Sequence, residues 1–251
     1  MNTAFYTGAS GLRAYQYAID VTSHNLVNAN TYGYKATNTE FRELLYSNMD
    51  INKNRELEDD AKVHTGHGVR LSNQDLLFTQ GPLYNSGYQL DYAIAGEGLF
   101  AVDRRGEIEY TRSGSFDLSI EGPNEEAYLV TADGAYVLDR NYQRIQVPYE
   151  RGTNVIDSSR IPRQLGVFSF SNVFGLQRKN YESYSPTDIS GDPQIAANDI
   201  YKIYEQSLER SNVDIAKEFA DVIVSQKAYQ FSARVVTTAD EIEQVVNSLR
   251  K

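Results

Sequence analysis

The last forty residues of the chain carry apolar side chains at steps of three or four residues, or their sum, which marks one face of a helix. No glycine or proline interrupts residues 212–251. The pattern therefore predicts a single helix over this range, roughly 60 Å long, with Ser211 and Asp214 forming a capping box at its start. A helix of that length needs partners along it. Its apolar positions are Phe219, Val222, Tyr229, Ala233, Val236, Ala239, Ile242, Val246 and Leu249.

The first thirty residues show a second periodic pattern, in which the spacing alternates between three and four. This seven-residue repeat is typical of a coiled-coil seam with a left-handed supercoil, and small residues such as Gly8 and Ala18 allow another backbone to approach. Asn30 or Gly33 is expected to end the helix in the left-handed conformation. The alternative is two amphipathic helices that pack on the core of their own domain. The seam positions are Phe5, Gly8, Leu12, Tyr15, Ile19, Thr22, Leu26 and Ala29.

Between these ends, from His64 to Asp139, short runs of Val, Ile, Leu, Phe and Tyr are separated by glycines, which predicts antiparallel strands. One hairpin is expected over residues 100–111, with Gly106 in its turn. A second hairpin is expected around the Asp-Gly pair at residues 133–134. Residues 164–170 predict a last strand.

The predicted fold class is α+β, with N- and C-terminal helices forming a coiled-coil-like α layer and a central, mainly antiparallel β domain. We expect the two helices to lie antiparallel to each other. The polar segment 48–62 predicts a loop, or a segment that becomes ordered only on assembly. The expected boundaries are 1–35 for the N-terminal helix, 36–75 for an extended linker and loop region, 76–198 for the β domain and 199–251 for the C-terminal helix.

Composition argues against several classes of function. The net charge is -10 with no basic patch, which argues against nucleic acid because its phosphates require clustered Lys and Arg. The chain has no Cys, so disulfides, thiolate metal sites and a Cys nucleophile are unavailable. We expect neither a membrane span nor a cleaved secretory signal, since no apolar run approaches about eighteen residues. The 19 Tyr with no Trp suit a subunit with many protein contacts, or simply a Tyr-rich β domain.

Two short motifs resemble ligand sites but lack essential parts. His64 and His67 have no third ligand nearby in the sequence, so a turn leading into a strand is favoured over a metal site. The segment GEGLFA at residues 96–101 lacks the third glycine of a dinucleotide-binding loop, and no helix is expected after it. We interpret that segment as a place where two backbones pack closely, and we expect no metal and no cofactor.

Four acidic residues could be imagined as a glycosidase pair, which needs two carboxylates facing each other across a cleft. Most of them lie in or beside the hairpin turn around Gly106, which favours solvated charge. We therefore expect no catalytic residue. The four are Glu97, Asp103, Glu107 and Glu109.

Several motifs resemble the flagellar rod and hook family, the axial proteins of the bacterial flagellar basal body. Residues 24–35, HNLVNANTYGYK, are similar to the N-terminal signature of that family. The segments FTQGPL, LDYAIAGEGLF, YTRSGSF and LVTADG follow in family order, as do FSNVFGL and residues 208–241. The resemblance thus covers nearly the full chain.

The chain departs from the family pattern at His24, at Val27 and in segment 141–163, which is shorter than in distal rod relatives. Within the family, the pattern resembles distal or proximal rod proteins more than hook protein, whose central domains make it much longer.

The resemblance implies a structural subunit that assembles into a helical tube in the basal body, spans the cell envelope, transmits torque and is required for swimming. Implied partners are further copies, other rod and hook proteins and the flagellar type III export apparatus, with export without a cleaved signal. Neither nucleic acid nor a small-molecule substrate is expected. A rival hypothesis is a carbohydrate-binding or enzymatic β domain with helical oligomerisation ends. The expected assembly interface comprises Phe5, Leu12, Tyr15, Ile19, Leu26, Asn28, Gly33, Phe219, Val222, Tyr229, Val236, Ile242, Val246 and Leu249.

Overall fold

The computed structural model of the 251-residue chain describes residues 3–44, 46–49, 63–121, 126–148, 160–179, 182–197 and 199–249. The fold has two compact units, each of which combines segments that are distant in the sequence. Unit 1 comprises residues 1–27, 37–75 and 214–251, and unit 2 comprises residues 28–36 and 76–213. The α+β class, with a helix at each end and a mostly antiparallel β region between them, is confirmed.

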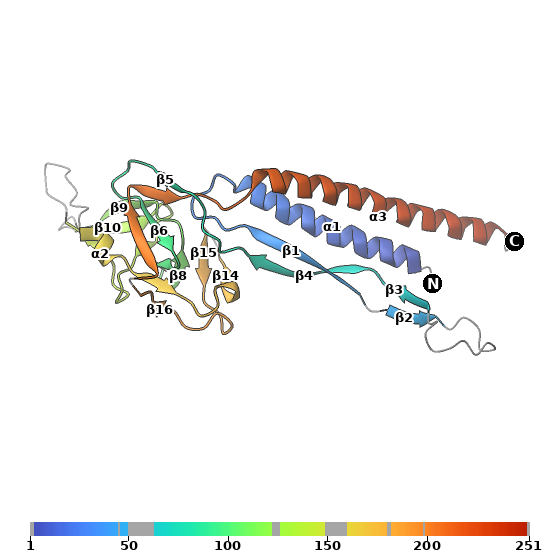
Figure 1. The fold of residues 1–251 in the computed structure, drawn as a ribbon, viewed down its shortest axis with the longest axis horizontal. Helices are drawn as coiled ribbons and strands as arrows, with labels where there is room; N and C mark the ends of the chain where they lie inside the picture. The colour runs from blue at the N-terminus through green and yellow to red at the C-terminus, as the bar shows by residue number, and fades with distance from the viewer. Residues whose placement is uncertain are drawn as a thin grey trace. The chain divides into compact units, whose positions relative to one another are not determined.

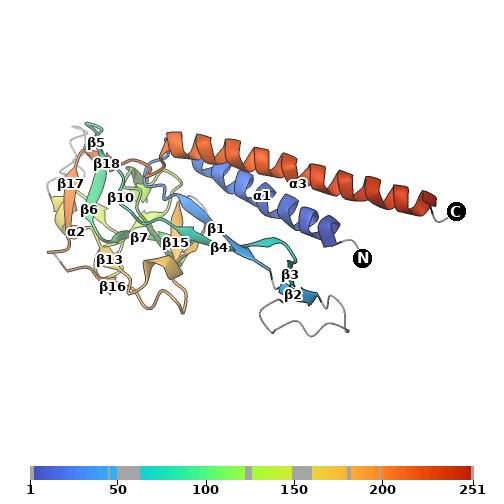
Figure 2. The same ribbon diagram turned by 45° about the vertical axis from the view of Figure 1, so that its right-hand side comes forward.

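Unit 1 contains two long helices and paired strands. Helix α1 spans Thr3–Val27 and helix α3 spans Ile215–Leu249; they run side by side in opposite directions (Figure 1). The expected linker region is largely strand, and β1 packs along α1 (Figure 2). Its strands are β1 (Thr37–Glu43) paired with β4 (Val69–Leu76), and β2 (Tyr46–Met49) paired with β3 (Val63–Gly66). Most of the predicted loop 48–62 lies outside the described residues.

Asp214, rather than Ser211, caps helix α3. Its Oδ1 accepts hydrogen bonds from the backbone N–H groups of Ala216 at 3.0 Å and Lys217 at 3.2 Å. These bonds satisfy two donors that have no partner within the helix, which is the role of an N-cap. The capping box predicted at Ser211 is therefore wrong by three residues.

The expected start of the C-terminal helix at residue 199 is also wrong. Strand β17 (Tyr201–Glu205) pairs with β6 (Tyr92–Gly96), and β18 (Ser207–Glu209) pairs with β5 (Leu83–Asn85). Tyr201 and Ile203 alternate toward the core of unit 2, which is the two-residue period of a strand. Strand β17 has only five residues, so its two-residue period could not be distinguished in the sequence from the helical pattern that follows.

The main sheet of unit 2 has strand order β12-β10-β11-β7-β8-β15-β14, with β9 paired to β10, and β13 paired to β7 and β16. Every strand pair in this sheet is antiparallel. The strands are β7 (Leu99–Arg104), β8 (Glu107–Thr111), β9 (Phe116–Glu121), β10 (Glu126–Thr131), β11 (Tyr136–Val137), β12 (Gln146–Val147), β13 (Val167–Ser169), β14 (Gln177–Arg178), β15 (Ser183–Ser185) and β16 (Gln194–Ile195). The short helices are α2 (Ile161–Gln164) and η2 (Val173–Gly175).

Both predicted hairpins are confirmed. In the first, Asp103 pairs with Ile108, and the two turn residues Arg105 and Gly106 both have positive φ. That combination suits a tight turn between twisted strands. In the second, β10 pairs with β11 around Gly134, whose φ is +83°. The predicted strand over 164–170 is shorter than expected: α2 ends at Gln164, and β13 covers only Val167–Ser169.

Unit 2 has two hydrophobic clusters. One contains the fully buried Tyr92, Phe100 and Leu129, and the other contains Phe168 and Tyr184. The close backbone packing expected for the GEGLFA segment is confirmed, because a Cβ atom on Gly96 would collide with the carbonyl oxygen of Ile200.

Candidate assembly surface

The two helices of unit 1 approach each other through small residues. A Cβ atom on Gly8 would lie 2.8 Å from Cγ2 of Val236, and one on Gly11 would lie 2.8 Å from Oγ of Ser232. Both distances are shorter than ordinary contacts, so larger side chains would separate the helices. These pairs also fix the antiparallel register, since residue numbers fall on α3 as they rise on α1.

Asn25 connects three elements of unit 1. Its Nδ2 donates to the carbonyl of Thr37 at 2.8 Å and to Oε1 of Glu218 at 3.1 Å, while its Oδ1 accepts from the N–H of Thr37 at 3.0 Å. It thereby joins α1, β1 and α3. Burial raises the pKa of Glu218, and the hydrogen bond from Asn25 opposes that shift.

Of the eight predicted seam positions of α1, Gly8 and Thr22 are buried, and four others each lie one residue after a buried position. Leu12, Tyr15, Ile19 and Leu26 are half-buried, and Tyr15 packs on Phe41 with ring centroids 5.5 Å apart. The sequence pattern gave weight to large apolar residues, whereas the closest packing uses small ones. The buried residues are Gly8, Gly11, Ala14, Ala18, Thr22 and Asn25.

The predicted interface residues of α3 fall into two groups. Val222 and Val236 are half-buried, and Val236 contacts α1 at Gly8. The remaining predicted positions are exposed, as is Phe5 on α1. These α3 positions are Phe219, Tyr229, Ile242, Val246 and Leu249.

A second apolar stripe on α3 was missed. Six large apolar side chains lie at heptad positions of α3, and Ala228 and Thr238 fill the remaining positions of that repeat. The six large side chains are 45–81% exposed. A heptad started at Val224 rather than Phe219 would have revealed it. We call this set the outer stripe: Val224, Phe231, Val235, Ile242, Val245 and Leu249.

Asn28 and Gly33, also expected at the interface, lie in unit 2 rather than with the helices. Gly33 is buried and its N–H donates to the carbonyl of Glu209 at 2.8 Å. Its φ is +73°, and a Cβ atom there would collide with the backbone of Ser113. Because α1 already ends at Val27, neither Asn30 nor Gly33 is its C-terminal cap.

Unit 2 holds a buried charged cluster that the sequence pattern did not reveal. Nζ of Lys35 lies 2.7 Å from Oε1 of Glu209, and the guanidinium of Arg112 pairs with the other carboxylate oxygen. Lys35 also donates to the carbonyl of Thr79 at 2.8 Å, and the N–H of Gly81 donates to Glu209 at 2.8 Å. Burial lowers the pKa of Lys35, and Glu209 opposes that shift.

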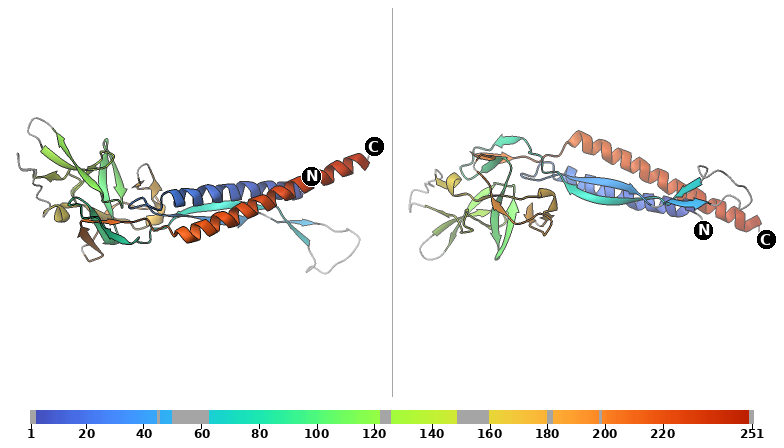
Figure 3. Two further views of the ribbon diagram at one scale, coloured as in Figure 1. Left: turned by 90° about the horizontal axis from the view of Figure 1, so that it is seen from above. Right: turned by 60° about the horizontal axis from the view of Figure 1, so that its bottom comes forward.

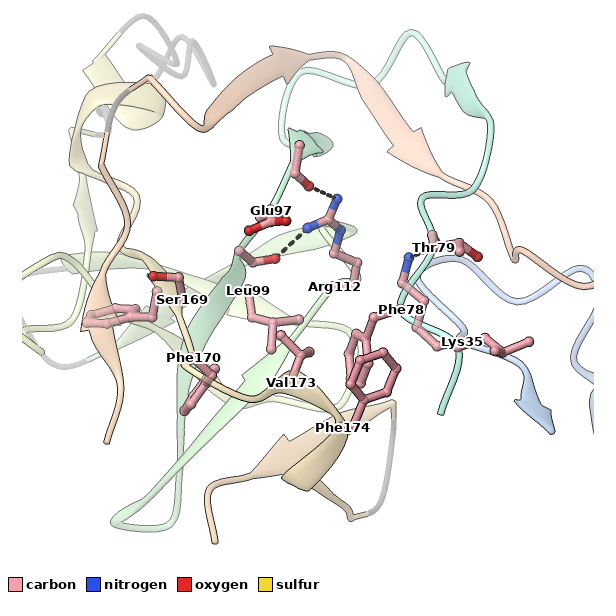
Figure 4. A pocket seen from close by; sticks show the side chains of 14 residues that line it. Lys35, Phe78, Thr79, Glu97, Leu99, Arg112, Ser169, Phe170, Val173 and Phe174 are labelled. Carbon is pink, nitrogen blue, oxygen red and sulfur yellow. Dashed lines mark hydrogen bonds between the residues drawn. The ribbon is translucent and has the colours of Figure 1, made fainter. Parts of the chain in front are cut away.

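A cavity of about 360 Å³ lies beside this cluster (Figure 4). Its walls are mostly apolar, with Phe78, Leu99 and Phe170 among the lining residues. Arg112 donates to the backbone carbonyls of Gly96 and Gly98, so it serves the protein's own backbone there. The two cations of this cavity, Lys35 and Arg112, therefore bind groups of the protein itself.

Of the four acidic residues considered for a glycosidase pair, three have partners of their own, and Glu97 lines the cavity just described. Asp103 bonds Arg144 and Glu107 bonds Lys179, both as ion pairs. Glu109 is buried, contrary to expectation, and accepts hydrogen bonds from Arg104 at 2.9 Å and Ser183 at 2.6 Å. In the described part of the chain, no group of three His, Asp or Glu residues could hold a metal ion, and no described helix is long and apolar enough to cross a membrane.

Three family models match the chain. "Flagella basal body rod protein" matches residues 5–35, "Flagellar hook protein FlgE/F/G D1 domain" matches 93–160, and "Flagellar basal body rod FlgEFG protein C-terminal" matches 204–249. Together they cover both ends and the first half of the main sheet.

The chain is also similar over its length to curated proteins. It is 33% identical to the flagellar basal-body rod protein FlgG of Agrobacterium fabrum, over 97% of this chain and 98% of that protein. It is 28% identical to FlgG of Bacillus subtilis, over 100% of both chains. It is 30% identical to the flagellar hook-basal body complex protein FlhP of the same organism, again over 100% of both.

Proposed function

The chain belongs to the flagellar basal-body rod protein family, and from this premise we propose that the outer stripe of α3 is the surface through which its copies pack in the rod. As a family member it is a structural subunit of the basal-body rod and not an enzyme. It resides in the flagellar basal body and assembles with other axial proteins. The finer assignments below are our proposals.

One observation carries the proposal: six large apolar side chains stand exposed at heptad spacing on one helix. Burying a side chain of this kind stabilises an assembly by about 1.5–3 kcal/mol relative to leaving it in water. Exposed apolar patches of this extent mark contact surfaces, and heptad spacing suits another helix. A second copy of the same chain supplies such a helix.

Helical growth follows if one surface of a copy binds a different surface of the next, so that the contacts never close a ring. We propose that these contacts transmit torque and that swimming requires them. Among the expected interface residues, Ile242 and Leu249 belong to the outer stripe, whereas Val236 serves contacts inside unit 1.

Export through the flagellar type III apparatus, without a cleaved signal, is also proposed. Residues 3–27 form α1, which packs along α3, and residues 5–35 match a rod-protein family model, which supports retention of this segment in the working protein. The net charge of -10 supports the absence of a nucleic-acid partner, and the family supports the absence of a small-molecule substrate.

Substitution of Ile242 by Asp tests the proposal, with Gln230→Asp as the matched control. Ile242 is 57% exposed, and Gln230 is exposed on a different face of α3. We expect Ile242→Asp to change the melting temperature of the monomer by less than about 2 °C while abolishing rods and swimming, because its carboxylate would be buried only on assembly. Gln230→Asp should retain both. Normal rods with Ile242→Asp would contradict the proposal.

A further inference from the structure

A groove runs between α1 and β4 of unit 1. Its volume is about 640 Å³, and its walls include Phe5, Ala9 and Tyr17 from the helix and Leu71 from the strand side. Each wall also carries one arginine among its lining residues, Arg13 on α1 and Arg70 on β4. Within the described residues, no carboxylate forms an ion pair with either arginine. The groove is thus lined mainly by apolar side chains and carries one arginine on each wall.

The last part of α3 has the complementary character. Every residue from Glu241 to Leu249 is exposed. The apolar ridge of this segment consists of Ile242, Val245, Val246 and Leu249. At 3.6 residues per turn, Glu241 and Glu243 fall on opposite sides of that ridge. The ridge is thus negative at both edges.

The ridge and the groove of one chain do not meet. Gly8 of α1 contacts Val236 of α3, and position 246 lies ten residues farther along α3, or about 15 Å. Figure 3 shows the C-terminal end of α3 continuing past the N-terminal end of α1 in both views. Within this unit, the ridge therefore has no cover from its own α1.

We infer that the ridge of one copy seats in the α1–β4 groove of a second copy, a contact that rests on the proposed function and identifies the acceptor surface. The apolar side chains supply the attraction, and the two glutamates meet the two arginines on the groove walls. Complementary charges of this kind set orientation and partner choice more than affinity. Ridge and groove are different surfaces, so the contact is heterologous and propagates from copy to copy.

Cysteine pairing tests this contact directly, because the chain has no cysteine of its own. One variant carries Ala9→Cys in the groove and a second carries Val246→Cys on the ridge. The two are mixed, allowed to assemble and then oxidised. We expect a covalent dimer that contains one copy of each variant. A disulfide requires Cα atoms within about 7 Å, so a bond between these positions of one chain is excluded.

The matched control replaces Ala9→Cys with Asp20→Cys, which lies on an exposed part of α1 eleven residues farther along. It should give at least tenfold less of the mixed dimer. Filaments that form without an Ala9–Val246 link, or with equal linking at Asp20, would overturn the docking and leave the proposed function standing. A wild-type protein that remains monomeric at every concentration would overturn both.

Charge reversal gives an independent readout. Arg13→Glu with Arg70→Glu should slow filament growth, and so should Glu241→Arg with Glu243→Arg. A mixture of the two double variants should restore at least part of the rate through contacts between unlike copies. No loss in either double variant, or no recovery on mixing, would contradict the assigned charge pairing.

Discussion

Phe168 in unit 2 and Phe231 in unit 1 have the same side chain in opposite surroundings: Phe168 is 0% exposed and Phe231 is 62% exposed. The contrast extends to the two units. Unit 2 buries many large aromatic and aliphatic side chains in two clusters, whereas the helices of unit 1 fully bury mainly Gly, Ala, Ser and Thr. Unit 2 therefore has the interior of an independent domain. Unit 1 keeps many of its large apolar side chains exposed or only half-buried, which suits a part completed by neighbouring copies.

The largest expected effect is on the charged cluster of unit 2, where Glu209 compensates two cations. Glu209→Gln would leave Lys35 and Arg112 buried without a counter-charge, and we expect a loss of about 3–5 kcal/mol in the free energy of unfolding. Denaturant titration of the monomer measures it. Glu107→Gln in the exposed pair with Lys179 is the control and should leave stability close to wild type. If Glu209→Gln lowered the free energy of unfolding no more than Glu107→Gln does, the cluster would not stabilise unit 2.

A matched pair of Phe→Ala substitutions tests the contrast between the units. Phe168→Ala should cost about 3–5 kcal/mol in monomer stability because it empties a packed core. Phe231→Ala should leave the monomer nearly unchanged and should instead reduce assembly. Thermal melts and sedimentation of the same two variants give both readings. A large loss of monomer stability in Phe231→Ala would place this residue in a core of its own chain.

The small-residue seam inside unit 1 is tested at Gly8. Gly8→Val would force its side chain against Val236, and we expect a loss of about 1–3 kcal/mol in stability. Ala9→Val is the control because Ala9 lines the groove beside β4 instead. If both variants melt alike, the close approach of α1 and α3 at this point is wrong.

The smallest expected effect is a pH dependence at Glu218. Its pKa in the folded protein is raised above its ordinary value of 4.5, mainly by burial. A raised pKa contributes stability below the unfolded value, and that contribution is lost as the pH rises through the folded value. Glu218→Gln removes this dependence while keeping an acceptor for Asn25. We expect the melting temperature of Glu218→Gln to vary less with pH than that of wild type between the unfolded and the folded pKa of Glu218. An unchanged pH profile would contradict this role.

The sequence predicted those parts of the fold in which one period dominates. The helices and both hairpins follow from steps of three and four residues, and from Gly106 and Gly134 in their turns. It did not predict β17, because five residues of alternating burial precede a long helix and are lost in its pattern. Lys35, Glu209 and Arg112 are too far apart in the chain for any periodic pattern to bring them together.

The candidate surface was predicted in part. Ile242 and Leu249 lie in the outer stripe, but Val224 and Phe231 were missed because a single stripe was assumed for α3. Exposure distinguishes two stripes on one helix, and apolar spacing alone does not. Small residues such as Gly11 also carry little weight in a hydrophobic pattern, although they determine where α1 and α3 come closest.

Cryo-electron microscopy of the assembled rod tests the central claim most directly, since it shows what covers the outer stripe. We predict that Val224, Phe231, Val235, Ile242, Val245 and Leu249 are each in contact with another subunit, and that the cores of unit 2 are unchanged. An assembled rod in which these side chains face water, while subunits meet only through unit 2, would contradict the account.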